Sequence, residues 1–382
     1  MRDGRAEVNF LTRFAAASRR IRRIQGLHRL IFGRRFRQNT ARRLLILFEP
    51  NRISYASVFP FLTYAEAFRA RYDVEIRCLP VEQALQRGIP EGLSSATHVL
   101  AQTWLTDPRH RHEQLEQLML SLNPGVTSAY LDTFANCDIR WAGVFESTAF
   151  YYKKSLFTDL SEFSRSTFGH TNLTEYYGRL YGLENEMMDW GVPSSALLKL
   201  RLAPNFLTDP DLSAALLAEP RRAPPQKDID LHARIGGTSA DSWYGEMRRH
   251  AARVVDELDG LRVAKGIGVS RRVFGQELLR SKACFSPFGY GELCWRDIEA
   301  IAAGAVLIKP DMSHLRTEPD LYRDGETYIA CRWDFADFSE KLRKILADEE
   351  RRLYLTKNAR RIAQTYLEMS GPVSTYAELF SN

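Results

Sequence analysis

Short apolar runs alternate with amphipathic segments along the chain from Leu44 onward. The first run, Leu-Leu-Ile-Leu-Phe at 44–48, is continuously apolar, as expected of a strand buried on both faces of a parallel sheet. The strands predicted in this part of the chain are 44–48, 74–78, 98–104 and 126–132, and the helices between them are 60–72 and 113–122. Strands separated by helices in this way predict a doubly wound α/β sheet.

A second block of the same kind follows a proline-rich interval. Residues 208–227 contain four prolines, at positions 210, 220, 224 and 225, near acidic and basic residues, a composition typical of a linker. The strands predicted beyond it are 229–234, 261–264, 283–286, 305–310 and 328–331, and the helices are 243–258, 273–282, 292–303, 335–347 and 349–365. We therefore expect two doubly wound Rossmann-like domains, 44–207 and 228–382, joined by the linker 208–227 and facing a ligand-binding cleft.

Polar residues stand at the carboxyl ends of the strands predicted in the first domain, where doubly wound sheets bind their ligands. They are Glu49, Asn51, Thr103 and Asp132. Each is also an ordinary loop residue. Position alone therefore leaves both interpretations open, a ligand contact or a plain surface position.

The stretch 286–304 contains the strongest candidate for a ligand-binding site in the sequence. It reads as a strand end, a turn with Gly289 and Gly291, and a helix that stops at Gly304. The two turn glycines allow the backbone to approach a ligand closely, and the helix that follows supplies unpaired N–H groups and the positive end of its dipole. This combination predicts a site for a phosphate or pyrophosphate.

The helix predicted over 292–303 carries a charged face. Glu292, Arg296 and Glu299 recur at i, i+4 and i+7, away from the apolar stripe. A carboxylate accepts hydrogen bonds from sugar hydroxyls, and an arginine binds phosphate through two parallel N–H groups. The alternative is an ordinary Glu–Arg pair on the surface of a helix.

Residues 140–185 interrupt the regular alternation and are dense in aromatic, hydroxyl and amide side chains. The densest parts are 151–155 and 170–177. Carbohydrate sites need such groups, because sugar hydroxyls seek planar hydrogen-bonding partners and sugar C–H faces pack on aromatic rings. A long surface excursion with ordinary tyrosines is the alternative.

The basic charge of the chain is concentrated in an N-terminal arm, residues 1–43. The arm holds 13 Arg and no Lys against Asp3 and Glu7, a net charge of +11, so the other 339 residues sum to 6 − 11 = −5. Residues 8–32 show the periodicity of a basic amphipathic helix. Three interpretations of this helix are open. It lies on an anionic membrane surface, or it packs on the first domain with its basic face in solvent, or it serves as a transit peptide or a nucleic-acid contact.

Several classes of site are disfavoured. The chain has no run of 18 apolar residues, its five cysteines form no CxxC pair, and its histidines form no HExxH pattern. We therefore expect no transmembrane helix, no disulfide framework and no metal site. Asp228 and Asp230 have the DxD spacing of some divalent-metal sites, but they open a predicted strand, where solvated aspartates are ordinary. Neither GxGxxG nor GxxxxGK[ST] occurs.

Residues 226–365 resemble the nucleotide-binding half of GT-B glycosyltransferases, closest to the glycosyl transferase group 1 and spore-maturation-protein-like families. The segment Glu299-Ala-Ile-Ala-Ala-Gly304, followed by the apolar residues 305–308, is similar to the E-A-x-A-x-G signature of these families. Residues 324–328 and the closing helices are similar to the usual end of the domain. The segment 151–182 is also similar to the middle of sugar-transferring proteins from polysaccharide gene clusters.

The resemblance implies a nucleotide-sugar donor held by the C-terminal domain, an acceptor bound by the N-terminal domain and no metal requirement. Glu299 matches the family carboxylate that binds the ribose of the donor. The second family carboxylate would fall at 291, which is Gly here, so Glu292 is one residue late as a contact for the donor sugar. Arg234 and Lys265 occupy places similar to the basic residues that face the diphosphate.

The function expected from the sequence is therefore glycosyl transfer from a nucleotide-sugar to a hydroxyl acceptor, in polysaccharide or glycoconjugate synthesis. Gly289, Gly291 and Arg296 join Arg234 and Lys265 around the diphosphate, and Asp132 is the candidate base if the reaction inverts the anomeric centre. A nucleotide-sugar epimerase or phosphorylase and a non-catalytic nucleotide-binding protein are the alternatives.

The expected partners and location follow from this expected glycosyl transfer. The partners are the nucleotide-sugar, which serves as substrate with no separate cofactor, and a glycan or lipid-linked acceptor, with no nucleic acid. The location is the cytoplasm, at the inner face of the membrane if residues 8–32 bind an anionic surface.

Overall fold

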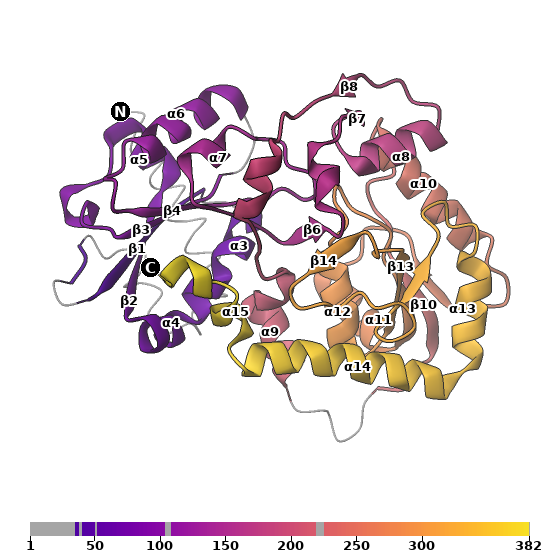
Figure 1. The fold of residues 1–382 in the computed structure, drawn as a ribbon. Coiled ribbons are helices and arrows are strands. Elements are labelled where there is room, and N and C mark those ends of the chain that lie inside the picture. The colour runs from indigo at the N-terminus through magenta and orange to yellow at the C-terminus, as the bar shows by residue number, and fades with distance from the viewer. Residues whose placement is uncertain (1–34, 38–39, 50–51, 104–107, 219–224, 382) are drawn as a thin grey trace, which may run out of the picture.

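The computed structural model describes residues 35–37, 40–49, 52–103, 108–218 and 225–381. Two parallel sheets form two lobes that lie side by side (Figure 1). The N-terminal arm falls almost entirely outside the described residues, and so does Asn51. Among the described residues, no helix has the length and apolarity needed to cross a membrane.

The first sheet has six parallel strands in the order β2-β1-β3-β4-β5-β9. Its strands are β1 (Arg42–Phe48), β2 (Val74–Pro80), β3 (His98–Ala101), β4 (Thr127–Leu131), β5 (Phe150–Lys153) and β9 (Leu200–Leu202). The helices of this part of the chain are α3 (Arg52–Thr63), α4 (Ala65–Tyr72), α5 (Val81–Arg87), α6 (Pro108–Leu120), α7 (Val144–Ser147) and α8 (Asn172–Leu180). The alternating side chains of β1 explain its apolar run: Leu44 and Ile46 join one core cluster, whereas Leu45 and Leu47 join the cluster on the opposite face.

The second sheet has five parallel strands in the order β11-β10-β12-β13-β15. Its strands are β10 (Ile229–Ala233), β11 (Val263–Lys265), β12 (Ser281–Phe285), β13 (Val306–Pro310) and β15 (Ile329–Cys331). The accompanying helices are α10 (Trp243–Asp256), α11 (Arg271–Leu279), α12 (Trp295–Ala303), α13 (Phe338–Ala347) and α14 (Glu349–Glu368). The chain leaves β10 in one direction to β11 and returns on its other side to β12, so the strand order reverses between β10 and β12. Open α/β sheets bind ligands beside this switch point.

A second type of pairing ties the two domains together. Strand β6 (Ser155–Phe157) of the first domain pairs antiparallel with β14 (Leu315–Thr317) of the second, and Thr158 N–H donates to the carbonyl of His314 at 2.8 Å. The other short pair is β7 (Thr167–Phe168) with β8 (Met187–Met188). The 3₁₀ helices are Glu91–Leu93, Leu160–Ser164, Ser194–Lys199, Phe206–Thr208 and Ala377–Phe380. Because β6–β14 crosses the domain boundary, one edge of the interdomain seam is closed by backbone hydrogen bonds.

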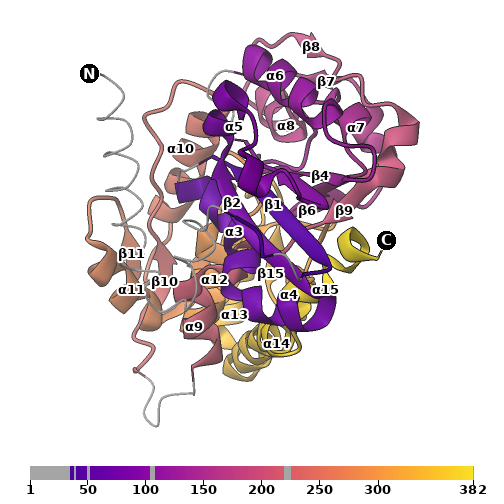
Figure 2. The same cartoon turned by 90° about the vertical axis from the view of Figure 1, so that its left-hand side faces the viewer.

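The C-terminal segment returns to the first domain. After α14, the helix α15 (Gly371–Ser374) lies beside α4 (Figure 2), where the Arg71 guanidinium donates to Ser374 Oγ at 2.7 Å. The ring of Phe380 stacks on Tyr72 with centroids 5.0 Å apart. The last residues of the chain therefore complete the core of the first domain.

Several expectations about secondary structure were wrong. Residues 210–217, predicted as linker, form α9 (Pro210–Leu217), which Asp209 caps and which buries Leu212 and Leu216. Helix α12 begins at Trp295 instead of residue 292, so Glu292 precedes it. Residues 42 and 43, assigned to the arm, open β1. The helix predicted at 60–72 is in fact two helices, α3 from Arg52 and α4, and strands β5 and β9 were not predicted. Most of the other predicted elements lie within a few residues of the observed ones, and packing and caps set their ends.

Candidate functional site

A cavity of about 530 Å³ lies at the carboxyl ends of β10 and β12, beside the switch point of the second sheet. Its lining residues are Arg248, Val269, Arg271, Phe274, Gly289, Cys294, Trp295, Arg296 and Glu299. They come from α10, the loop before α11, α11 itself, the turn after β12 and the first half of α12. The cavity therefore collects three arginines, one carboxylate and an apolar wall in one place.

The direction of α12 is fixed at its first turn. The N–H of Cys294 donates to Asp297 Oδ2 at 3.0 Å, which caps the helix from inside. The buried carboxylate of Asp297 also accepts from Ser286 Oγ at 2.6 Å and from Tyr322 OH at 2.7 Å, and it pairs with the buried Lys309 at 3.2 Å. Because Ser286, Tyr322 and Lys309 are all buried, this network holds the turn after β12 against the start of α12.

Arg248 bridges the loops on both sides of the switch point. Its Nε donates to the carbonyl of Gly236, after β10, at 2.8 Å, and its Nη1 donates to the carbonyls of Phe288 at 3.0 Å and Pro287 at 3.3 Å, after β12. Burial, followed by the nearby Arg296, lowers the pKa of this guanidinium. An anion in the cavity would offset the repulsion between the positive charges of Arg248 and Arg296.

Arg248 was not predicted as a site residue from the sequence. The sequence did carry a sign of its role, because Arg248 lies in line with Ala251 and Val255 on the buried stripe of α10. A charged residue on an apolar stripe requires partners or a ligand.

Arg296 presents a hydrogen-bond donor at the cavity wall. Its Nη2 donates to the carbonyl of Arg234 at 2.5 Å, whereas its buried Nε has no acceptor within the described part of the chain. Buried N–H groups in folded proteins are nearly always paired. A ligand oxygen beside Arg296 would satisfy this donor.

Glu299 follows Arg296 by three residues and lines the same cavity. Arg271 Nη2, at the start of α11, lies 3.8 Å from Glu299 Oε1. Phe274, Val269 and Trp295 give the cavity its apolar surface. Three guanidinium groups against one carboxylate favour an anionic ligand, and the apolar surface suits a flat ring such as a nucleobase.

Of the two turn glycines, only Gly289 lines the cavity. Gly291 contacts the first domain: a Cβ atom at this position would lie 1.8 Å from the carbonyl oxygen of Ala135. The close approach that Gly291 permits is therefore between two segments of this chain.

Glu292 lies in the interdomain seam. Its side chain is fully buried, and its Oε2 accepts from the backbone N–H of Cys137 in the first domain at 3.0 Å. Its Oε1 is 3.9 Å from His314 Nε2. The expectation that Glu292 shares a helix face with Arg296 and Glu299 is wrong, because the residue precedes α12 and turns the other way.

Arg234 and Lys265 do not line the cavity. Arg234 Nε and Nη2 donate to the carboxylate of Glu277 at 3.0 and 2.6 Å, and Nη1 donates to the carbonyl of Lys265. The amine of Lys265 donates to Asp256 at 2.6 Å. Arg234 reaches the site only through its backbone carbonyl, which accepts from Arg296.

Asp132 is buried in the first domain with both oxygens engaged. Its Oδ2 accepts from Tyr151 OH at 2.7 Å and from Lys153 Nζ at 2.6 Å, and its Oδ1 accepts from the N–H of Phe134 at 2.7 Å. This carboxylate organises the ends of β4 and β5. Tyr151, Tyr152 and Tyr177, part of the region predicted to bind carbohydrate, are core residues.

The DxD pair forms ion pairs within the second domain. Asp228 pairs with Arg262 at 3.1 Å and with Arg280, and Asp230 pairs with Lys282 at 2.7 Å. Among the described residues, no group of three His, Cys, Asp or Glu side chains is arranged to hold a metal ion.

Comparisons with known proteins support the fold assignment. No protein-family model matches the sequence, and no curated protein is similar to it. An alpha-glucosyltransferase in complex with UDP and a 13-mer DNA containing a HMU base has a similar structure, with a TM-score of 0.52 and 9% identity over 89% of this chain and 99% of that chain. An alpha-glucosyltransferase in complex with UDP-glucose and DNA containing an abasic site gives a TM-score of 0.50 at the same identity and coverage. The prediction of a two-domain GT-B fold is confirmed.

Proposed function

We propose that this protein is a glycosyltransferase that binds a nucleotide-sugar in the arginine-lined cavity and transfers the sugar to a hydroxyl acceptor. One observation carries the proposal: three arginines and Glu299 converge at the carboxyl ends of β10 and β12. This is where a GT-B fold has its switch point, and the similar structures contain UDP or UDP-glucose. Membership of the group 1 and spore-maturation-protein-like families, and a role in polysaccharide or glycoconjugate synthesis, remain part of the proposal.

Each part of the cavity has a role toward such a donor. Arg248, Arg271 and Arg296 bind the diphosphate and stabilise the negative charge that develops on it as the glycosidic bond breaks. Glu299 accepts hydrogen bonds from the ribose hydroxyls, and the apolar wall at Phe274 packs on the base. We propose that the arginines carry out the charge compensation without a metal ion.

We propose retention of the anomeric configuration. An inverting transfer needs a protein base beside the acceptor, and Asp132, the candidate from the sequence, accepts three hydrogen bonds in the first domain. The anomer of the product, read by NMR, tests this assignment. A product of inverted configuration would refute it.

Donor binding is tested by a panel of nucleoside diphosphates and nucleotide-sugars. Binding of one base class at 100 times its Kd should stabilise the protein by about 2.7 kcal/mol, seen as a rise of several degrees in Tm. Glu299→Gln should weaken that affinity about 10-fold or more, because it removes a charge-assisted hydrogen bond. Glu340→Gln, an exposed glutamate on α13, is the matched control and should bind as the wild type does. No response to any nucleotide, or full affinity in Glu299→Gln, would reject the proposal.

The alternative chemistries are separated by omitting the acceptor. An epimerase or phosphorylase would convert the nucleotide-sugar without an added alcohol, whereas a transferase would require the alcohol. A protein that only binds nucleotide would show the thermal shift with no turnover under either condition.

A nucleic acid as the acceptor is the second candidate, and it replaces the expectation that nucleic acid plays no part. Two observations favour it: the similar structures contain DNA, and residues 1–43 carry a net charge of +11. A glycan or lipid-linked acceptor remains the first candidate, because residues 44–382 are net acidic.

A further inference from the structure

A second cavity, of about 650 Å³, opens at the interdomain seam and shares no residue with the arginine-lined cavity. Its walls come from both domains: Phe157, Thr158, Asp159, Glu162, Arg165, Asn172, Glu175, Tyr176 and Arg179 from the first, and His314 and Trp333 from the second. It lies beside the β6–β14 pair and the start of α8. A ligand here would contact both domains at once.

Aromatic rings form one wall of this seam cavity. Tyr176 meets Trp333 edge to face, with centroids 4.9 Å apart, and His314 also lies 4.9 Å from Trp333. The indole is held in place because Trp333 Nε1 donates to the carbonyl of Asp311 at 2.9 Å. Fixed aromatic rings beside hydrogen-bonding groups are what the C–H faces and hydroxyls of a sugar need.

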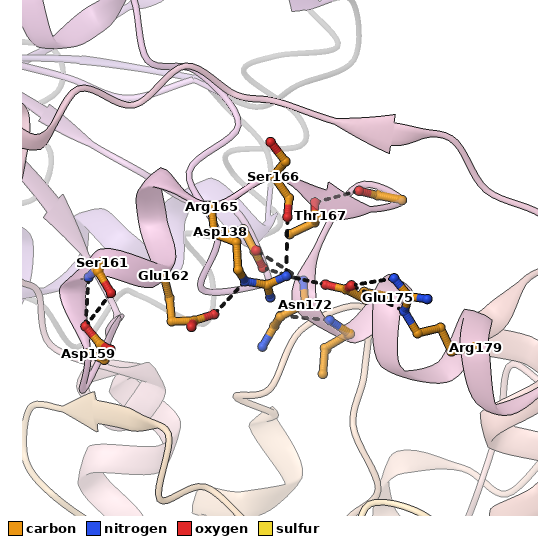
Figure 3. Close-up of polar contacts among 12 residues, drawn as sticks. Asp138, Asp159, Ser161, Glu162, Arg165, Ser166, Thr167, Asn172, Glu175 and Arg179 are labelled. Carbon is orange, nitrogen blue, oxygen red and sulfur yellow. Dashed lines mark hydrogen bonds and ion pairs between the residues drawn. The ribbon is translucent and has the colours of Figure 1, made fainter.

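The two arginines of the seam cavity are paired with carboxylates, as Figure 3 shows. Arg165 lies between two carboxylates, with Nε donating to Glu162 at 2.8 Å and Nη1 donating to Glu175 at 2.5 Å. Arg179 Nη2 donates to the other oxygen of Glu175 at 3.1 Å. Both guanidinium groups are therefore paired, in contrast to the excess of arginine over carboxylate around the first cavity. This wall offers planar donors and acceptors without an excess of positive charge, which suits a neutral polyol better than a phosphate.

His314, which lines the seam cavity, and Glu292, which lies close to it, have unused hydrogen-bonding capacity. Neither ring nitrogen of His314 has a hydrogen-bond partner in the described portion of the chain. The same holds for Glu292 Oε1, which lies 3.9 Å from His314 Nε2, too far for a hydrogen bond. A buried polar atom without a partner costs about 1–3 kcal/mol. A ligand hydroxyl that reaches His314 would recover part of that cost.

We propose that the seam cavity binds a neutral saccharide. The rings of Tyr176 and Trp333 pack on its C–H face, and the Arg165–Glu175 pair and Asn172 hydrogen-bond its hydroxyls. The proposal stands on the chemistry of the seam cavity and is independent of the transferase proposal, because binding here requires neither a donor nor a transfer step.

Saturation-transfer NMR tests this site with the full chain. The probes are the methyl glycosides of glucose, galactose, mannose, rhamnose and N-acetylglucosamine, with maltotetraose, cellotetraose and chitotetraose as chains. At least one probe should receive saturation on its ring C–H protons. Tyr176→Ala and Glu175→Gln should each weaken its binding about 5-fold or more, and Tyr354→Ala, an exposed tyrosine on α14, should not. Preference for a tetrasaccharide over its methyl glycoside would identify a site for a chain instead of a single sugar.

Three outcomes would overturn the proposal. They are no binding of any probe, binding that survives both Tyr176→Ala and Glu175→Gln, and displacement of the saccharide by UDP alone, which would place it in the arginine-lined cavity. Thermal unfolding of each variant checks that it is folded. Because Glu175→Gln preserves the shape of the side chain, a failure of Tyr176→Ala to fold leaves the test intact.

Discussion

Gly291 of the second domain lies directly against Ala135 of the first. A Cβ atom on Gly291 would be 1.8 Å from the carbonyl oxygen of Ala135 and 2.5 Å from the backbone nitrogen of Asn136. The next residue, Glu292, accepts a hydrogen bond from the N–H of Cys137 at 3.0 Å. The turn after β12 thus has two functions: its Gly289 end lines the arginine cavity, and its Gly291 end sets the contact between the domains.

Gly291→Ala should therefore lower the free energy of unfolding by about 1–3 kcal/mol, because neither backbone can move without opening the seam. Urea denaturation measures the change. Gly125→Ala is the control, since a Cβ there would have no heavy atom within 4 Å, and it should be neutral or slightly stabilising. Wild-type stability in Gly291→Ala would show that the two domains separate at no cost.

The pair formed by Asp132 and Lys153 gives a second test, because both side chains are buried and the ion pair is 2.6 Å long. Lys153→Met leaves the carboxylate buried without its cation and should cost about 3–5 kcal/mol of stability. The double variant Asp132→Asn/Lys153→Met should regain part of this loss. A stability of Lys153→Met equal to that of the wild type would contradict the structural role.

The same variants separate structure from catalysis. If Asp132 were the base of an inverting transfer, Asp132→Asn would lower the single-turnover rate by about 10²–10⁴-fold. With the structural role inferred above, the rate of folded Asp132→Asn protein should change much less.

Local patterns were enough to predict the sheets and part of the arginine cavity. The run at 44–48 could only be a strand buried on both faces, and the register of Gly289, Arg296 and Glu299 after β12 placed them in one cavity. These features depend on residues that are close in sequence. The same was true of the end of α12 at Gly304, which adopts a positive φ of 65°.

Features that depend on distant residues could not be read from the sequence. The start of α12 is set by Asp297, whose buried partners Tyr322 and Lys309 come later in the chain. The pairing of Leu315 with Phe157 joins segments that carry no signal of one another. Arg234 lies at the end of a strand, as expected, but its guanidinium forms an ion pair with Glu277 on α11 and does not line the cavity. Tertiary packing decided each of these cases.

Asp138 should make stability depend on pH. Burial raises the pKa of this carboxyl to about 7, and the charge of Glu292 adds to the effect. Between pH 4 and pH 7 the folded chain keeps a proton that the unfolded chain has lost, so the stability contributed by Asp138 is present below pH 4 and is lost as the pH rises through 7. The loss is at most about 4 kcal/mol.

Asp138→Asn should remove this dependence. The free energy of unfolding of the variant should rise relative to wild type between pH 4 and pH 7, then run parallel to it above pH 8. Asp241→Asn, on an exposed loop residue, is the control. A constant difference between wild type and Asp138→Asn across this range would show that Asp138 ionises normally in the folded protein.

The arginine arm is best tested by a deletion that stops before the first described residue, at position 35. Phe36 is buried and its N–H donates to Gly92, so residues 1–34 should be removed and the rest retained. This deletion takes away nine arginines, Asp3 and Glu7, a net charge of 9 − 2 = +7. Each basic residue near an anionic bilayer contributes about 1 kcal/mol, so sedimentation with phosphatidylglycerol-containing vesicles should fall to background while the nucleotide-induced thermal shift stays unchanged.

A full-length variant with Arg19, Arg20, Arg22 and Arg23 changed to Gln serves as the charge control, because it keeps the length and the apolar positions of the arm. It should lose most of the vesicle binding as well. Duplex DNA is the competing ligand: affinity that falls steeply with salt in the full chain, and is lost on deletion, would favour the nucleic-acid acceptor over a membrane surface. Undiminished binding of both vesicles and DNA by the truncated chain would refute any role of the arm in binding, and would leave the folded domains as the binding surface.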